Sequence, residues 1–129
     1  MKIAFATTAF CGLVLASSMI GTRAMAIEPD PGQVVFYDDY QCKKEPHLVL
    51  NKGSYPDLRT YDLSEPGGAT WNNRISCFKI GEGVKLKVFE KINYAGKSKE
   101  FGRTSSNPAG MWSLSGNWWD NSVSSVKIY

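Results

Sequence analysis

Short apolar runs, separated by clusters of Gly, Pro, Asn and Ser, predict an all-β chain. The runs rich in Val, Ile, Phe and Tyr lie at 32–40, 47–50, 75–80, 84–92, 97–101 and 122–129. In the clearest run, Val84, Leu86 and Val88 alternate with two lysines, so one face of this strand is apolar and the other is charged. No stretch of the sequence keeps a helical period beyond a turn or two. We therefore expect short strands joined by turns.

The first 26 residues differ in character from the rest. Lys2 precedes a largely apolar run from Ile3 to about Ile20, and the small-x-small pattern Ala24-Met25-Ala26 follows. This order predicts a secretory signal peptide over 1–26 and hence a secreted protein. The alternative is a single membrane-spanning helix, but a span needs about 20 strongly apolar residues and this run contains several polar ones. We expect no stable membrane insertion.

Residues 27–32 contain Pro29 and Pro31 and are predicted to be an N-terminal tail, followed by one domain over 33–129. Removal of the leader takes away two basic residues and no acidic one, so the formal charge falls from +3 to +1. No basic run or stripe remains that could neutralise phosphates, and we expect no nucleic-acid partner.

Candidate catalytic groups are few. His47 is the one histidine, no carboxylates are paired at a suggestive spacing, and no glycine-rich phosphate loop is present. We expect no enzyme. Cys11 leaves with the leader, and Cys42 and Cys77 remain. In an oxidising compartment an isolated pair most simply forms one disulfide, and two buried free thiols are the alternative.

The chain also repeats itself with a period of about fifty residues, which suits four-stranded units. "WNNRISCFKI" at 71–80 matches "WDNSVSSVKI" at 119–128 column for column. Upstream of each, at 35–44 and 87–98, an apolar-aromatic strand enters a turn that ends in Tyr-x-small-Lys. Two such units predict a two-sheet sandwich with halves at about 33–82 and 83–129.

These duplicated motifs resemble the βγ-crystallins, whose Greek key motifs carry the calcium-binding signature Asn/Asp-Asn/Asp-x-x-Ser/Thr-Ser. The signature is complete at 120–125 and matches five of six positions at 72–77, where Cys77 replaces the final serine. The family's hairpin pattern appears as Phe89 to Gly96, and in the first half Cys42 takes the place of that glycine. The resemblance implies one βγ-crystallin-like β-sandwich. It also implies that Cys42 and Cys77 lie close enough for a disulfide.

The resemblance implies two calcium sites that the signatures share in a crossed way. Ser124 would share an ion with Asn72, Asn73 and Arg74, and Ser76 would share one with Asp120, Asn121 and Ser122, while Asp38 and Glu90 in the hairpins would add main-chain carbonyls. Such neutral oxygens suit Ca²⁺ but attract it weakly. We expect one or two weakly held ions, with the better site at Asp120.

Asn, Asp and Ser are also ordinary turn formers, so calcium binding has a structural alternative. Two classes of function stay open at this stage. One is a secreted calcium-binding structural or stress-related protein. The other is a secreted toxin or protease-inhibitor-like effector with degenerate calcium sites. An extracellular protein or glycan partner is also open, because Trp118 and Trp119 point to opposite sides of an extended chain and at least one of them could be exposed.

Overall fold

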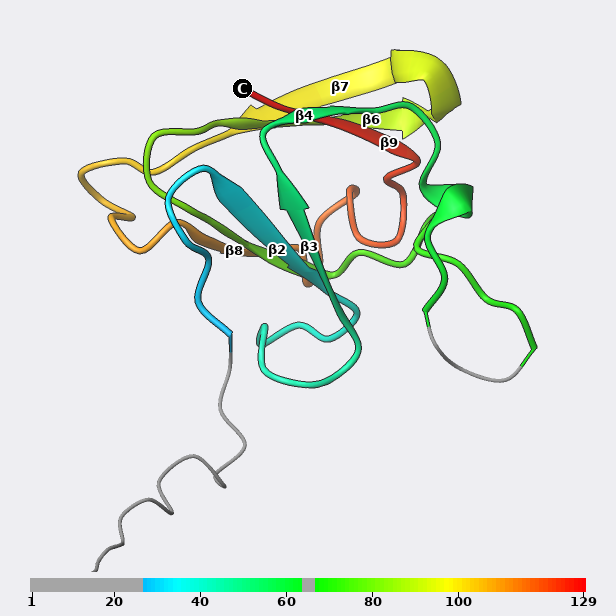
Figure 1. Ribbon diagram of the computed structural model, residues 1–129, viewed down its shortest axis with the longest axis horizontal. Coiled ribbons are helices and arrows are strands. Elements are labelled where there is room, and N and C mark those ends of the chain that lie inside the picture. Colours follow the sequence, from blue (N-terminus) through cyan, green and yellow to red (C-terminus); the bar gives the residue numbers. More distant parts are fainter. Residues whose placement is uncertain (1–26, 64–66) are drawn as a thin grey trace, which may run out of the picture.

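Eight strands form two antiparallel sheets in the part of the chain that the computed structural model describes, residues 27–63 and 67–129 (Figure 1). The first sheet has the order β3 (His47–Asn51), β2 (Gln33–Tyr37), β5 (Cys77–Ile80) and β8 (Met111–Ser113). The second has the order β4 (Gly53–Tyr55), β9 (Ser125–Ile128), β6 (Leu86–Lys91) and β7 (Ala95–Phe101). The predicted all-β sandwich is confirmed, and the predicted signal peptide lies outside the described residues.

The two halves of the chain exchange one strand each. β4, from the first half, pairs with β9 in the second sheet, with Gly53 opposite Ile128. β8, from the second half, pairs with β5 in the first sheet, with Cys77 opposite Ser113. The sequence pattern did not predict β4 or β8, because each has three residues and shows no clear alternation. This exchange makes the two halves one folding unit.

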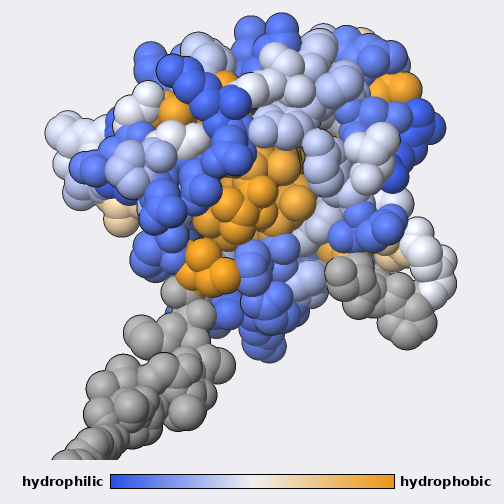
Figure 2. All heavy atoms as spheres, in the orientation of Figure 1, coloured by the Kyte–Doolittle hydropathy of each residue, from blue (hydrophilic) through white to orange (hydrophobic). Residues whose placement is uncertain are grey.

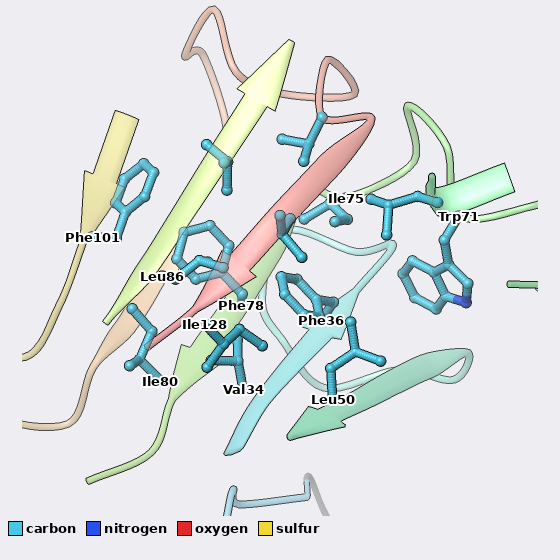
Figure 3. Packing of buried hydrophobic residues seen from close by; sticks show 14 of the residues in the cluster. Val34, Phe36, Leu50, Trp71, Ile75, Phe78, Ile80, Leu86, Phe101 and Ile128 are labelled. Carbon is cyan, nitrogen blue, oxygen red and sulfur yellow. The ribbon is translucent and has the colours of Figure 1, made fainter. Parts of the chain in front are cut away.

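The main core lies between the two sheets (Figure 3). Phe78 is fully buried, and its ring packs against Phe36 at 6.1 Å and against Phe101 at 4.9 Å between centroids. The predicted apolar positions of the alternating run in and before β6 are all buried. Trp71 and Trp119 are buried as well, whereas Trp118 is 50% exposed. The duplicated tryptophans are therefore core residues.

The outer face of the first sheet carries a smaller buried cluster, Val35, Tyr37, Cys42 and Cys77. The predicted N-terminal tail is bound over this face. The Tyr37 hydroxyl donates to the carbonyl of Ile27 at 2.9 Å, and burial raises the pKa of Tyr37. The ammonium of Lys79, almost fully buried, contacts the carboxylate of Glu28 at 2.7 Å. These contacts hold the start of the described chain in place.

The segment from Gly53 to Leu63 is a short strand followed by the 3-10 turn η3 (Leu58–Thr60). Leu58 is fully buried, and its N–H donates to the carbonyl of Ser124 at 3.0 Å. The second 3-10 turn, η4 (Ile92–Tyr94), follows β6, and the N–H of Asn93 donates to Pro56 at 2.7 Å. The segment therefore supports the turn after β6.

Figure 2 shows a mostly hydrophilic face with an apolar patch near its centre, between the sheets.

Candidate metal centre

Two short loops carry the repeated signature, one at 72–76 and one at 120–124, and we call them the first loop and the second loop. Each follows a buried tryptophan and leads into a strand. The second residue of each loop is an asparagine in the left-handed region, Asn73 with φ of 58° and Asn121 with φ of 55°. Asparagine adopts this conformation more readily than most residues. The repeat therefore preserves backbone geometry as well as sequence.

The loops are joined by equivalent backbone hydrogen bonds. The N–H of Asn73 donates to the carbonyl of Val123 at 3.0 Å, and the N–H of Asn121 donates to that of Ile75 at 3.1 Å. In each bond the donor comes from one half of the chain and the acceptor from the other. The two loops therefore lie against each other and are related by an approximate twofold axis.

Side-chain contacts follow the same crossed pattern. The Ser124 hydroxyl donates to the side-chain oxygen of Asn73 at 3.2 Å. The Ser76 hydroxyl lies 3.2 Å from the side-chain oxygen of Asn121 and 2.8 Å from Oδ1 of Asp120. The structure thus brings each serine to the loop with which the resemblance would have it share an ion.

Each hairpin lies beside one of the two serines. The N–H of Ser76 donates to the carbonyl of Tyr37, the residue before Asp38, and the N–H of Ser124 donates to that of Phe89, each at 2.9 Å. The hairpin after β2 therefore adjoins Ser76, and the hairpin after β6 adjoins Ser124. We use two names for the ligand sets that the resemblance implies: site A for Asp38, Ser76, Asp120, Asn121 and Ser122, and site B for Glu90, Ser124, Asn72, Asn73 and Arg74.

In site A, both carboxylate oxygens of Asp120 accept hydrogen bonds. Ser76 donates to Oδ1, and the Tyr40 hydroxyl donates to Oδ2 at 2.6 Å. The Asp120 carboxylate, through this hydrogen bond and its negative charge, raises the pKa of Tyr40. Hydroxyl groups can rotate, so both could offer lone pairs to a cation instead. Sequence reasoning did not find Tyr40, because its role depends on a partner 80 positions away.

An ion pair links the two sites. The guanidinium of Arg74, which belongs to the first loop, contacts Oδ2 of Asp38 in the first hairpin at 2.7 Å. The atoms of Asp38 and Arg74 that the resemblance implies as calcium ligands are main-chain carbonyls. This ion pair involves only side-chain atoms. The fixed positive charge nevertheless weakens the attraction of site A for a dication. With Asp38, Asp120 and Arg74 counted together, site A keeps a net formal charge of −1.

Site B contains an oxygen acceptor without a donor. Oδ1 of Asn72 is buried and accepts no hydrogen bond within the described part of the chain. A buried acceptor left unpaired costs about 1–3 kcal/mol. Glu90 turns its side chain to the hairpin, where Oε1 accepts from the N–H of Lys97 at 3.1 Å. An unpaired amide oxygen fits the preference of a hard cation for oxygen ligands.

Neither site resembles a high-charge metal centre. Within residues 27–63 and 67–129, no three His, Cys, Asp or Glu side chains gather closely enough to hold an ion. A cation at either site would therefore depend mainly on amide, hydroxyl and carbonyl oxygens. Such a donor set suits Ca²⁺ at low affinity, and it does not suit zinc, which prefers thiolate and imidazole ligands.

The predicted disulfide is confirmed. Cys42 and Cys77 are bonded, with their Cα atoms 5.4 Å apart, and both are fully buried. Cys42 has φ of 55°, and Gly96, the corresponding residue of the second half, has φ of 76°. Cys77 directly follows Ser76 of site A. The bond therefore fixes the first hairpin beside that site.

In the second half of the chain, hydrogen bonds take the place of the disulfide. The Ser125 hydroxyl, at the position equivalent to Cys77, donates to the carbonyl of Lys91 at 2.6 Å and accepts from the N–H of Tyr94 at 3.1 Å. The serine closes the second hairpin without a covalent bond. The two hairpins thus have the same arrangement, closed in different ways.

The first hairpin contains a further element that the sequence analysis did not find. The Asp39 carboxylate accepts hydrogen bonds from the backbone N–H groups of Gln41, Lys43 and Lys44, at 3.0 to 3.3 Å. An aspartate whose side chain binds backbone N–H groups a few residues further on is a common turn former. The Asp38-Asp39 pair at the end of β2 could have indicated this turn.

The fold matches solved βγ-crystallin structures over most of the chain. A structure from work on the evolution of the eye-lens βγ-crystallin domain fold aligns with a TM-score of 0.61 and 18% identity, over 79% of this chain and 89% of that one. An archaeal βγ-crystallin aligns with a TM-score of 0.54 and 20% identity, over 78% of this chain and 100% of that one. This chain therefore has the βγ-crystallin domain fold.

A third match carries a metal. A double mutant of clostrillin in complex with nickel aligns with a TM-score of 0.55 and 25% identity, over 75% of this chain and 97% of that one. No protein-family model matches this sequence, and no curated protein matches it. The resemblance proposed from the duplicated signature is confirmed at the level of the fold.

One structural observation bears on membranes. Among the described residues, no helix is long and apolar enough to cross a bilayer.

Proposed function

We propose that this protein is a secreted, non-enzymatic, calcium-binding βγ-crystallin-like protein, with a structural or stress-related role, stabilised by one or two weakly held Ca²⁺ ions at sites A and B. The observation that carries the proposal is the crossed pairing of the loops. Ser76 and Ser124 each place a hydroxyl beside the amide oxygen of the opposite loop. Turn formation within one loop does not require this placement.

Some groups at sites A and B position the loops, and others would bind the ion. Backbone bonds between the loops hold the carbonyl and side-chain oxygens of both halves together. A bound calcium ion would supply a positive charge that these oxygens share. Because the unfolded chain offers no such site, binding stabilises the folded state. At a free concentration ten times the dissociation constant the gain is about 1.4 kcal/mol.

The two sites should differ in affinity. Site A has the Asp120 carboxylate and keeps a net negative charge despite the guanidinium of Arg74. Site B depends on amides, carbonyls and one hydroxyl, with Lys91 nearby. Fewer formal charges mean weaker attraction for a dication. We expect site A to bind more tightly, with both affinities toward the millimolar range typical of extracellular modules.

Two features support secretion. The leader pattern at 1–26 is followed at a distance by a fully buried disulfide. Structural disulfides persist in oxidising compartments and are rare in the cytosol.

Thermal melts of the oxidised protein test the proposal, from excess chelator to about 10 mM calcium. The melting temperature of the parent should rise with calcium. Asp120→Ala should lose most of the rise, and Asn72→Ala should lose a smaller part, since it affects only site B. Ser98→Ala, on exposed β7, is the matched control and should follow the parent.

Superimposed parent curves at every calcium concentration would refute calcium-dependent stability. Assays of protease inhibition and growth arrest would then become the next experiments. A rise of equal size in Asp120→Ala would refute the assignment to site A.

A further inference from the structure

A polar hollow of about 310 Å³ adjoins site B. It is lined by Asn73, Glu90, Lys91, Trp118, Asn121 and Ser122. These residues come from the first loop, the second hairpin, the second loop and the segment just before it. The hollow is large enough for one ring of a sugar. Four of its lining residues also belong to site A or site B, whereas Lys91 and Trp118 belong to neither.

Trp118 gives the hollow an apolar surface. Half of this residue is exposed, whereas the neighbouring Trp119 is buried and packs edge-on against it, with ring centroids 5.0 Å apart. The buried tryptophan thus fixes the exposed one in a defined orientation. A fixed indole presents a large, rigid, partly wet contact surface, a property that favours binding sites.

Two amides in the hollow have unused donors. Asn73 and Asn121 use their side-chain oxygens to accept from the serines of the opposite loops. Each amide also carries two N–H donors, and none of these donates to an acceptor within the described part of the chain. Paired donors beside an aromatic face match the hydroxyl groups of a sugar ring.

The charges around the hollow favour an anion. The ammonium of Lys97 lies 4.6 Å from the centre of the Trp118 ring, and Lys91 lines the hollow. Neither ammonium forms an ion pair with a described carboxylate. Glu90 is the one acid in the lining, and its Oε1 already accepts from a backbone N–H. Residues 83–129 as a whole carry seven basic and three acidic residues.

We propose that this hollow binds an acidic saccharide, a sugar unit that carries a carboxylate. The ring packs on Trp118, its carboxylate pairs with Lys97 and Lys91, and its hydroxyls accept from the amides of Asn73 and Asn121. The hollow shares Asn73 and Glu90 with site B and Asn121 and Ser122 with site A, but none of the proposed contacts needs a metal ion. The inference therefore goes beyond calcium binding and can be tested without calcium.

The test uses hexamers of galacturonic acid, mannuronic acid and hyaluronan as probes, with neutral cellohexaose as the comparison. Binding to the oxidised protein is followed by tryptophan fluorescence and by NMR shifts, in chelator so that metal bridging is excluded. At least one acidic hexamer should bind with a dissociation constant of about 1 mM or tighter. Cellohexaose should bind at least about tenfold more weakly.

Trp118→Ala should weaken binding about tenfold or more, and Lys97→Ala by a smaller factor. Trp118 is half exposed, so its loss should leave the fold intact, which circular dichroism checks. Met111→Ala, an exposed apolar residue on β8, is the matched control and should bind as the parent does. Asp120→Ala should also keep binding in chelator, which separates this proposal from the calcium proposal.

No binding of any acidic hexamer at about 5 mM would overturn the proposal. Equal affinity for cellohexaose, or unchanged binding by Trp118→Ala, would also overturn it. In that case Lys97 simply covers an exposed tryptophan as a surface cation–π pair.

Discussion

Ser124 donates its hydroxyl hydrogen to the side-chain oxygen of Asn73 at 3.2 Å, although 51 positions separate the two residues. Ser76 and Asn121 repeat the relationship at the same distance. In each pair, one residue comes from the first half of the chain and the other from the second. Both candidate sites therefore form only when the halves have docked, and a bound cation would report on the complete fold.

The Cys42–Cys77 bond should be a major source of stability. It closes a loop with a sequence separation of 35. In the chain-entropy model such a cross-link contributes about 3–4 kcal/mol. Cys42→Ser/Cys77→Ala should therefore lower the free energy of unfolding in urea by roughly this amount. A loss below about 1 kcal/mol would contradict this role of the bond.

The sequence of the second hairpin suggests a variant that should recover part of this lost stability. Cys42→Gly/Cys77→Ser restores the glycine and serine that close the other hairpin, where Ser125 bonds to Lys91 and Tyr94. Glycine also relieves the positive φ at position 42. This variant should be more stable than Cys42→Ser/Cys77→Ala by about 1–2 kcal/mol. Equal stability of the two variants would show that the hairpins do not close in equivalent ways.

Gly96 should resist replacement by alanine more than Gly116 does. Both have positive φ, 76° and 71°. A Cβ at Gly96 would lie 2.6 Å from Oε1 of Glu90 and 3.1 Å from its Cβ, whereas a Cβ at Gly116 meets nothing within 4 Å. Gly116→Ala should cost about 1 kcal/mol of backbone strain. Gly96→Ala should cost this and more in urea denaturation, and equal losses would count against the close contact.

Lys79 should depend on Glu28. The side chain of Lys79 is 8% exposed, and the Glu28 carboxylate is its ion-pair partner. Glu28→Gln leaves a nearly buried ammonium without its counter-charge and should destabilise the fold by about 1 kcal/mol. Lys79→Met removes the charge itself and should cost less. Urea denaturation measures both, with Glu82→Gln as a surface control, and the reverse order of losses would contradict this explanation.

Asp57 should contribute stability that depends on pH. Its carboxylate accepts from the guanidinium of Arg59 and also from the backbone N–H of that residue, and these bonds lower the pKa of Asp57 below 3.8. Because the folded-state pKa is the lower one, the contribution is present above 3.8 and is lost as the pH falls through the lowered value. Asp57→Asn should melt below the parent at pH 7. The gap should close in acid, and a gap that stays constant to about pH 2 would contradict the pair.

The repeat made the architecture predictable, because two copies of one strand-and-turn pattern constrain each other. The disulfide could be predicted from the isolated pair of cysteines, and the family resemblance implied that Cys42 and Cys77, which replace the glycine and serine of the other half, lie close together. The strands β4 and β8 escaped prediction, because three residues carry too little periodicity and their partners lie in the opposite half.

The loop residues of the candidate sites could also be predicted from the sequence. The ion pair and hydrogen bond that set the charge environment of site A could not. The Arg74–Asp38 ion pair and the Tyr40–Asp120 hydrogen bond join positions 36 and 80 residues apart. No local pattern marks such pairs. They depend on how the first hairpin packs against both loops, which only the folded structure specifies.

Calcium titration of the ¹⁵N-labelled, oxidised protein by NMR tests the central claim most directly, since it detects weak binding residue by residue. The account predicts saturable shifts confined to the loops and hairpins of sites A and B. Asp120→Ala should remove the shifts around site A and leave those around site B, and magnesium should give much smaller effects. Shifts spread evenly over the surface, or none at the two loops, would contradict calcium binding at the crossed loops.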